Sequence, residues 1–215
     1  VESNGYNYTQ IFRTPIALSG TEAASKLHGG RDRAYQRRKA SLEHKRDIAR
    51  ALYFGQRKED VSGASPRRTM GGLIEFLSGT DTTITFNSST KPLTYRNFDS
   101  EVAAAAFRYG SKEKLLIAGP FLASAINSWS ESRLVSDIAE DATYGIRVKN
   151  LITTYGDLKV IYDPLLEGSY KGYGFVLDPE NIRYAYLDGR DTKLYTDIQD
   201  NDVDGVIDEY LTECS

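Results

Sequence analysis

Residues 21–58 read TEAASKLHGGRDRAYQRRKASLEHKRDIARALYFGQRK, a segment whose pattern predicts a long helix. It contains no proline, so nothing in it forbids a continuous helix. Apolar residues recur at nearly heptad spacing, at Leu27, Ala34, Leu42, Ala49 and Leu52/Tyr53. This spacing predicts one long amphipathic helix with a narrow buried stripe, whose other, mostly charged positions face solvent.

The residues before and inside this stretch indicate where the helix begins. Residues 5–18 mix tyrosine, isoleucine, phenylalanine and threonine around Pro15, which is typical of an extended segment or of a loop that returns into the body of the protein. Ser19-Gly20-Thr21-Glu22 then fits a capping box, in which the serine and glutamate side chains satisfy free amides. Each glycine of the Gly29-Gly30 pair costs about 1 kcal/mol relative to alanine in a helix, so we expect a kink or a late start there. His28 and His44 are expected on the solvent side of this charged helix.

The rest of the chain alternates short helical and extended patterns. We expect a linker or flexible loop over 60–72, a short apolar element at 73–77, a strand at 82–86, a helix from Asn97 or Asp99 to Tyr109, a strand at 115–118 and a helix opened by Pro120. We expect β-pairs between 146–154 and 158–162 and between 173–177 and 182–187, followed by strands within 192–198 and 206–212. This order predicts an α+β fold and not a series of βαβ units.

Composition excludes several classes of protein. The 215 residues are 40% hydrophobic and 27% charged, which is enough to bury a core and argues against disorder. No apolar run approaches the roughly 20 residues that span a bilayer, and no signal peptide is recognisable, so we expect no membrane partner. Cys214 is the single cysteine, which excludes an internal disulfide and makes a reducing compartment the default. Because the chain begins at Val1 without methionine, we expect a processed protein or a piece of a longer one.

Charge and tyrosine are distributed in ways that suit contacts between proteins. Residues 31–50 hold eight basic residues against three acidic ones, whereas residues 178–215 hold eleven acidic residues against three basic ones. Such asymmetry can steer one copy of a protein onto another or turn a basic surface toward DNA, although two solvated faces would show the same pattern. The 15 tyrosines suit interfaces, and they equally suit strands.

No catalytic constellation is visible. The chain has neither a phosphate-binding Gly-x-x-x-x-Gly-Lys-Ser/Thr loop nor a Gly-x-Ser-x-Gly elbow. His28 and His44 are roughly 24 Å apart along a straight helix, too far to share a metal within one chain. Cys214 has no histidine near it in the sequence. We therefore expect no catalytic residues and no cofactor, and hence a protein that is not an enzyme.

One acidic segment fits part of a calcium loop. Asp200, Asp202 and Asp204 alternate and are followed by Gly205, as in the opening of an EF-hand loop. The position that should carry a bidentate glutamate is Leu211, and the flanking segments resemble strands. An acidic hairpin turn and a calcium-dependent binding module using these three aspartates are the two interpretations.

Several stretches together resemble one family. They are Tyr8–Arg13, Ser19–Ala24, Gly29–Ala40, Pro66–Gly72, Tyr109–Lys114, Asp163–Gly168 and Leu187–Leu194. They keep their order over nearly the whole chain and resemble the major capsid proteins of certain tailed bacteriophages, which share the Hong Kong 97-type capsid fold. The resemblance implies a long spine helix against a β-sheet, forming a peripheral domain, together with a mixed α/β axial domain.

The resemblance also implies a division of the chain and a function. Residues 1–20 would be the return arm of an extended loop, 21–72 the spine helix and linker, 73–177 the axial domain and 178–215 strands returning to the peripheral domain. The function implied is that of a virion subunit that self-assembles into an icosahedral shell around double-stranded DNA. Assembly would take place in the bacterial cytoplasm.

Its partners would be copies of itself in hexamers and pentamers, neighbouring capsid and portal proteins, and packaged DNA. The basic helix could then contact acidic neighbours or DNA, and we favour neighbours because the chain carries its own acidic counterpart. The expected subunit-interface residues are Arg31, Arg33, Arg37, Arg38, Arg46, Asp188, Arg190 and Asp191.

Overall fold

The computed structural model describes residues 5–25, 32–63, 65–78, 83–131 and 150–215. The chain has a mixed α/β architecture and divides into two compact units. Unit 1 comprises Val1–Gly79 and Tyr184–Ser215, and unit 2 comprises Thr80–Arg183. Each unit has its own sheet, and none of the described helices is both long and apolar enough to cross a membrane.

The sheet of unit 1 joins the two ends of the chain. Strand β1 (Gln10–Ser19) pairs antiparallel with β9 (Gly205–Cys214), and β9 pairs antiparallel with β8 (Lys193–Tyr195). The extended segment expected before residue 19 and the strands expected within 192–198 and 206–212 are therefore confirmed. Alternate side chains of β1, including Phe12, Ile16 and Leu18, are buried on one face of the sheet.

The expected single helix over 21–58 is wrong, because it is two helices. Helix α1 (Gly20–Ala24) begins as the capping box predicts, with the Ser19 hydroxyl accepting from the Glu22 amide at 3.2 Å. It ends at Ser25, whose ψ of 142° is extended. Helix α2 spans Asp32–Phe54, so the late start is confirmed, while the glycine pair itself lies outside the described residues.

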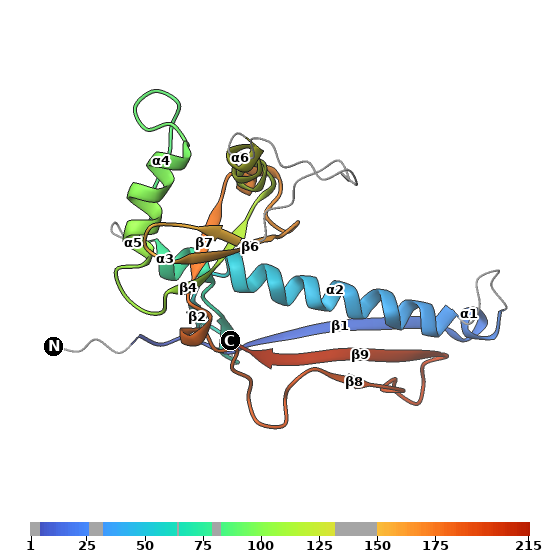
Figure 1. Cartoon of the computed structure of the whole chain (residues 1–215). Coiled ribbons are helices and arrows are strands. Elements are labelled where there is room, and N and C mark those ends of the chain that lie inside the picture. Colours follow the sequence, from blue (N-terminus) through green and yellow to red (C-terminus); the bar gives the residue numbers. More distant parts are fainter. Residues whose placement is uncertain (1–4, 26–31, 64, 79–82, 132–149) are drawn as a thin grey trace. The chain divides into compact units, whose positions relative to one another are not determined.

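Helix α2 lies along β1 and β9, as Figure 1 shows. The side turned to the sheet carries Ala40 and His44, and His44 is only 1% exposed. Ile48, Ala51 and Leu52 pack against a core cluster of Phe12, Met70 and Cys214. The solvent-side position expected for His44 is therefore wrong.

The apolar stripe expected on this helix is wrong for Ala34 and Leu42. Leu42 is 55% exposed and Ala34 is exposed, whereas Leu52 does contribute to the core. Successive helical residues turn by 100°, so Leu42 and His44 face nearly opposite ways. The side of α2 that packs on the sheet is the one whose polar residues, including Arg37 and His44, bond to residues of β1 and β9. Leu27, also part of the expected stripe, lies outside the described residues.

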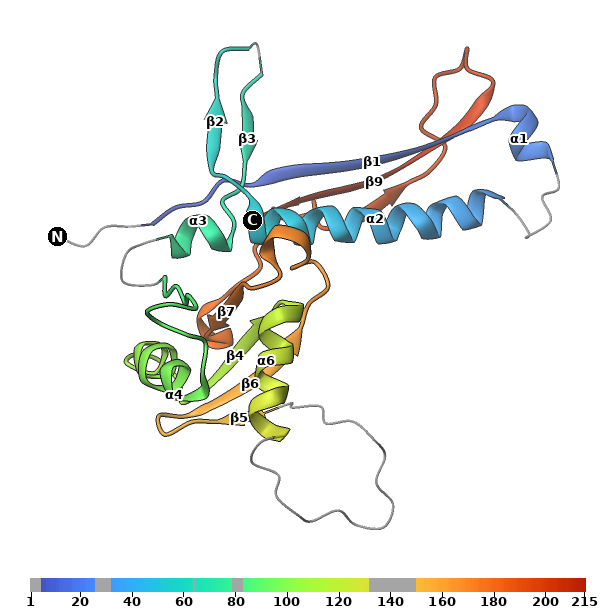
Figure 2. The same cartoon turned by 90° about the horizontal axis from the view of Figure 1, so that it is seen from above.

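The segment expected to be a linker is partly a hairpin. Strands β2 (Lys58–Asp60) and β3 (Arg67–Thr69) pair antiparallel and precede the expected apolar element, helix α3 (Leu73–Leu77); Figure 2 shows this hairpin beside the C-terminal end of α2. The chain crosses itself here, with the Gly72 amide donating to the Gly55 carbonyl at 2.8 Å. A Cβ on Gly55 would lie 2.4 Å from the Ala51 carbonyl oxygen, so the crossing requires glycine.

Unit 2 contains a mixed four-stranded sheet in the order β5-β6-β4-β7. The strands are β4 (Glu113–Ala118), β5 (Asn150–Ile152), β6 (Asp157–Tyr162) and β7 (Gly174–Leu177). Helix α6 (Pro120–Glu131) opens at proline as predicted, and β5 pairs with β6 as predicted. The expected pairing of 173–177 with 182–187 is wrong, because β7 pairs with β4 and Tyr186 instead forms a bridge with Cys214.

Unit 2 also contains one continuous helical stretch. It runs through α4 (Tyr95–Asn97), the π-helix η1 (Phe98–Ala103) and α5 (Ala104–Ala106). Its cap is Thr94, whose hydroxyl accepts from the Asn97 amide at 3.3 Å, and not Asn97 or Asp99 as expected.

The remaining segments of unit 2 are short. The strand expected at 82–86 is wrong for the described residues 83–86, which have no strand assignment, and the isolated bridge that follows them joins Asn87 and Lys91. Short 3₁₀ turns form η2 (Gly168–Tyr170) and η3 (Pro179–Asn181). The core of unit 2 includes Phe98, Leu116, Leu122, Ile126 and Leu158.

Candidate functional site

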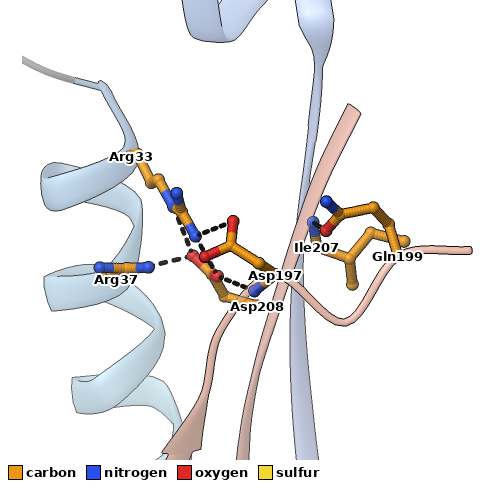
Figure 3. Close-up of polar contacts among 6 residues, drawn as sticks. All are labelled: Arg33, Arg37, Asp197, Gln199, Ile207 and Asp208. Atoms are coloured by element: carbon orange, nitrogen blue, oxygen red, sulfur yellow. Dashed lines mark hydrogen bonds and ion pairs between the residues drawn. The ribbon is translucent and has the colours of Figure 1, made fainter. Parts of the chain in front are cut away.

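A buried carboxylate, Asp208, organises the charged side of helix α2. It projects from β9 toward α2 and its side chain is 1% exposed. Arg33 Nε and Nη2 donate to its two oxygens at 2.9 and 2.6 Å, and Arg37 Nε donates to Oδ2 at 2.7 Å (Figure 3). Arginines four residues apart share one helix face, which is why both reach a single carboxylate. A buried charge is tolerated only when paired in this way.

The same carboxylate fixes the connection between β8 and β9. Asp197, at φ +56°, donates its backbone amide to Asp208 Oδ1 at 3.2 Å, and its own carboxylate accepts from Arg33 Nη2 at 2.8 Å. Gln199 Oε1 accepts from the Ile207 amide at 3.2 Å (Figure 3). Two carboxylates thus face two guanidinium groups. The hydrogen bond from Arg33, followed by that from Arg37, holds the pKa of Asp208 well below its ordinary value against the opposing effect of burial.

The opposite face of the sheet carries two more pairs of opposite charge. Arg13 on β1 makes two hydrogen bonds to Glu209, one of them Nη2 to Oε2 at 2.9 Å. Arg190 Nε donates to Glu213, and the Glu213 amide donates to the Arg190 carbonyl at 2.9 Å. These contacts tie the segment before β8 to β9. Arg190 therefore has an intramolecular partner, as do Arg33 and Arg37.

Asp208, Asp197, Arg33 and Arg37 together form the Asp208 cluster. A neutral polar network lies beside it. His44 Nδ1 is 2.9 Å from the Thr14 hydroxyl of β1, and His44 Nε2 is 2.8 Å from the Thr212 hydroxyl of β9. The Thr212 hydroxyl continues to the Thr192 hydroxyl at 2.8 Å. Burial lowers the pKa of His44, and the nearby Asp47 only partly opposes this effect. The neutral imidazole therefore joins α2 to both long strands of the sheet.

The other expected interface residues remain at the surface. Arg38, Arg46, Asp188 and Asp191 are exposed, and within the described ranges none of the four takes part in an ion pair. Arg31 lies outside those ranges. The structure thus separates arginines that hold the fold together from arginines that face solvent.

The acidic segment that fits part of a calcium loop has the geometry of a turn. The Val203 amide donates to the Asp200 carbonyl at 3.2 Å, and the Gly20 amide donates to the Asp204 carbonyl at 3.4 Å. The Asp204 carboxylate lies against the start of α1, where a Cβ on Gly20 would be 2.2 Å from Oδ1. Among the described residues, no group of three or more His, Cys, Asp or Glu side chains could hold a metal ion. Asp200, Asp202 and Asp204 are not brought together as ligands.

Two surface recesses lie among the described residues of unit 1. One lies at the β2–β3 hairpin loop between Asp60 and Arg67, and another lies between β1 and α2 near Pro15 and Lys39. Cys214 is fully buried, and burial raises the pKa of its thiol. In the hairpin recess the Ser62 hydroxyl donates to Asp60 Oδ1 at 2.6 Å, and both residues are exposed on the loop.

Sequence reasoning missed Asp208, Asp197 and the buried position of His44. A signal was present, because Val206, Asp208, Tyr210 and Thr212 alternate on one face of a strand while Arg33 and Arg37 recur at helical spacing. An aspartate among residues that face inward needs a cationic partner.

A comparison with known protein families gives a match over the whole chain. No curated protein matches the sequence. The family model described as SU10 major capsid protein matches residues 1–215, which confirms the resemblance to phage major capsid proteins. The chain therefore belongs to the SU10 major capsid protein family.

Proposed function

We propose that this structural capsid subunit builds an icosahedral shell around double-stranded DNA by non-covalent association with copies of itself, without catalysing a reaction. The observation that carries the proposal is the family match over the whole chain. A long helix on an antiparallel sheet, with a separate mixed unit, is compatible with the Hong Kong 97-type capsid fold. In this proposal, assembly takes place in the host bacterial cytoplasm.

The fold assignment follows the order of the elements. Residues 1–20 act as the return arm of an extended loop and 21–72 as spine helix and linker. Residues 73–177 act as the axial domain, and 178–215 as the strands that return to the peripheral domain. The boundary proposed at 73 places α3 in the axial domain, whereas contacts group α3 with unit 1.

The proposed contacts with neighbours use both kinds of charged residue. Arg31, Arg38 and Arg46 on the basic side, with Asp188 and Asp191 on the acidic side, meet complementary charges on other subunits. Arg33, Arg37 and Arg190 contribute by holding the helix and the sheet in the orientation that presents these residues. Portal protein and packaged DNA are further partners in this proposal.

Electron microscopy and sedimentation velocity of the full-length protein test the proposal. We expect closed shells or capsomers, whose proportion rises with protein concentration. Shells purified from infected bacteria should contain double-stranded DNA that resists added nuclease. A protein that stays monomeric at every concentration and salt would contradict the proposal.

A further inference from the structure

The side of α2 turned away from the sheet carries a mixed apolar and basic ridge. We define the outer ridge as Tyr35, Arg38, Leu42, Lys45 and Arg46, which recur at helical spacing opposite His44. Tyr35 is 65% exposed and Leu42 is 55% exposed. The three cations are exposed, and no described residue forms an ion pair with them. A helix that exposes large apolar side chains between unpaired cations has the character of an interface.

The connection between β8 and β9 has the complementary character. We define the acidic turn as residues 198–203. In it, Asp200 and Asp202 are exposed and have no ion-pair partner within the described residues, while Ile198 and Val203 are 44% and 47% exposed. The turn therefore offers carboxylates beside apolar side chains, the counterpart of a ridge with cations beside apolar side chains.

The base of the acidic turn is held rigidly. Asp197 is bound to Arg33 and Asp208, and the Ile198 amide donates to the Ile207 carbonyl at 2.9 Å. The Gln199 side chain accepts from the Ile207 amide on the same strand. A preformed turn loses little conformational entropy on binding. The Asp208 cluster thus positions the turn as well as the helix.

We infer that the acidic turn of one copy docks on the outer ridge of α2 of a second copy. The inference rests on the proposed function and names the surfaces that a capsid subunit would use. Ridge and turn are different surfaces of unit 1, so the contact is head-to-tail. A heterologous contact of this kind can close into rings, which is what capsomers require.

A second copy fits the ridge better than DNA does. Burial of Leu42 and Tyr35 requires apolar contact, which the phosphate backbone does not supply. The chain has a net charge of -3, and Asp47 and Glu43 interrupt the basic positions of the helix. An acidic protein surface with exposed Ile198 and Val203 satisfies both requirements.

The test is a charge swap in the full-length protein. The ridge variant carries Arg38→Glu and Arg46→Glu, the turn variant carries Asp200→Lys and Asp202→Lys, and the swap variant carries all four changes. A matched control carries Glu167→Lys and Glu180→Lys at two exposed positions in unit 2. Circular dichroism and thermal melts establish that each variant folds, and sedimentation velocity with electron microscopy measures the yield of shells.

The inference predicts that the ridge and turn variants each lose at least about tenfold in shell yield, because like charges then face each other. The swap variant should recover most of the loss, and the control should assemble like the wild type. Normal assembly of the ridge or turn variant, or no recovery in the swap variant, overturns the inference and leaves the capsid function intact. A ridge variant that assembles but binds less double-stranded DNA would assign the ridge to DNA. Failure of the wild type to form shells or capsomers would instead contradict the proposed function.

Discussion

The imidazole Nε2 of His44 lies 2.8 Å from the hydroxyl oxygen of Thr212, which joins the middle of helix α2 to the central strand of the sheet in unit 1. The other ring nitrogen contacts Thr14 on β1, so one side chain connects three elements. The ring is also 5.9 Å from that of Tyr210. A histidine in this position has a structural role, and because burial disfavours the charged form, its protonation destabilises the packed arrangement.

We predict that stability in unit 1 falls as pH falls below about 6.5. The pKa of His44 is lowered by burial, whereas an unfolded histidine titrates near 6.5, so the unfolded state binds more protons below that pH. The contribution of His44 is fully present above the unfolded pKa and decreases through the acidic window. Urea denaturation and amide exchange of β1 and β9, measured between pH 5 and 8, report the slope.

The matched variants for this prediction are His44→Gln and His28→Gln, since the chain has 2 histidines. His44→Gln should lower the free energy of unfolding at pH 7.5 by about 1–2 kcal/mol and flatten the slope, because glutamine does not titrate. His28→Gln, at a position outside the described residues, removes the other histidine and so shows whether the slope belongs to His44. An unchanged slope in His44→Gln would show that another group causes the pH dependence.

Asp208→Asn should destabilise unit 1 by about 2 kcal/mol. Asparagine keeps the shape but removes the charge that pairs with Arg33 and Arg37; Arg33 keeps its contact with Asp197, and the partial exposure of both arginines moderates the loss. The lowered pKa of Asp208 means that its contribution is present above the ordinary aspartate value near 3.9 and is lost only as pH falls further. Urea denaturation at pH 7 measures the change. Asp188→Asn, at an exposed position, should change stability by less than about 0.5 kcal/mol, and an equal loss in both variants would refute the assignment.

Gly110→Ala should destabilise unit 2 by about 1–3 kcal/mol. Gly110 has φ +84°, and a Cβ there would lie 2.4 Å from Asp178 Oδ2, which pairs with Lys114 Nζ at 3.2 Å. The single tryptophan, Trp129, packs 5.5 Å from Phe98 in the core of unit 2, so its fluorescence reports unfolding there.

The control for that prediction is Gly172→Ala. A Cβ on Gly172 would meet no atom within 4 Å, so this variant should unfold within about 0.5 kcal/mol of the wild type. Asp178 and Lys114 form the ion pair beside Gly110. The pKa of Asp178 is lowered to about 2, first by the hydrogen bond from the Ser111 amide, so this ion pair should persist to about pH 3. Equal stability of the two glycine variants would mean that the turn tolerates a side chain.

Leu42→Ala should leave the free energy of unfolding within about 0.5 kcal/mol, because Leu42 is 55% exposed. Ile16→Ala, at a position 7% exposed on β1, should cost about 2–4 kcal/mol. Urea denaturation of both variants distinguishes the buried face of unit 1 from its outer ridge. A large loss of unfolding free energy in Leu42→Ala would show that Leu42 is buried, as the heptad spacing predicts.

Most local elements could be predicted from short-range patterns in the sequence. Ser19 and Pro120 mark helix starts through properties of their own backbone and side chain, and alternation identifies the strand before Cys214. That the chain combines helices and strands follows from such elements, and the capsid family follows from ordered stretches over nearly the whole chain. These features depend on residues close together in the sequence.

Which face of α2 is buried, and which arginines are available to a partner, depends on contacts between segments far apart in the sequence. Leu42 and His44 lie on opposite sides of the helix, and hydrophobicity alone predicts burial of Leu42, which is the exposed residue. Asp208, Thr14 and Thr212 reverse that choice, because buried hydrogen bonds and ion pairs require partners that come from strands far away in the sequence. The pairing of β7 with β4, instead of with the segment that follows it in sequence, is likewise a long-range contact that local patterns do not specify.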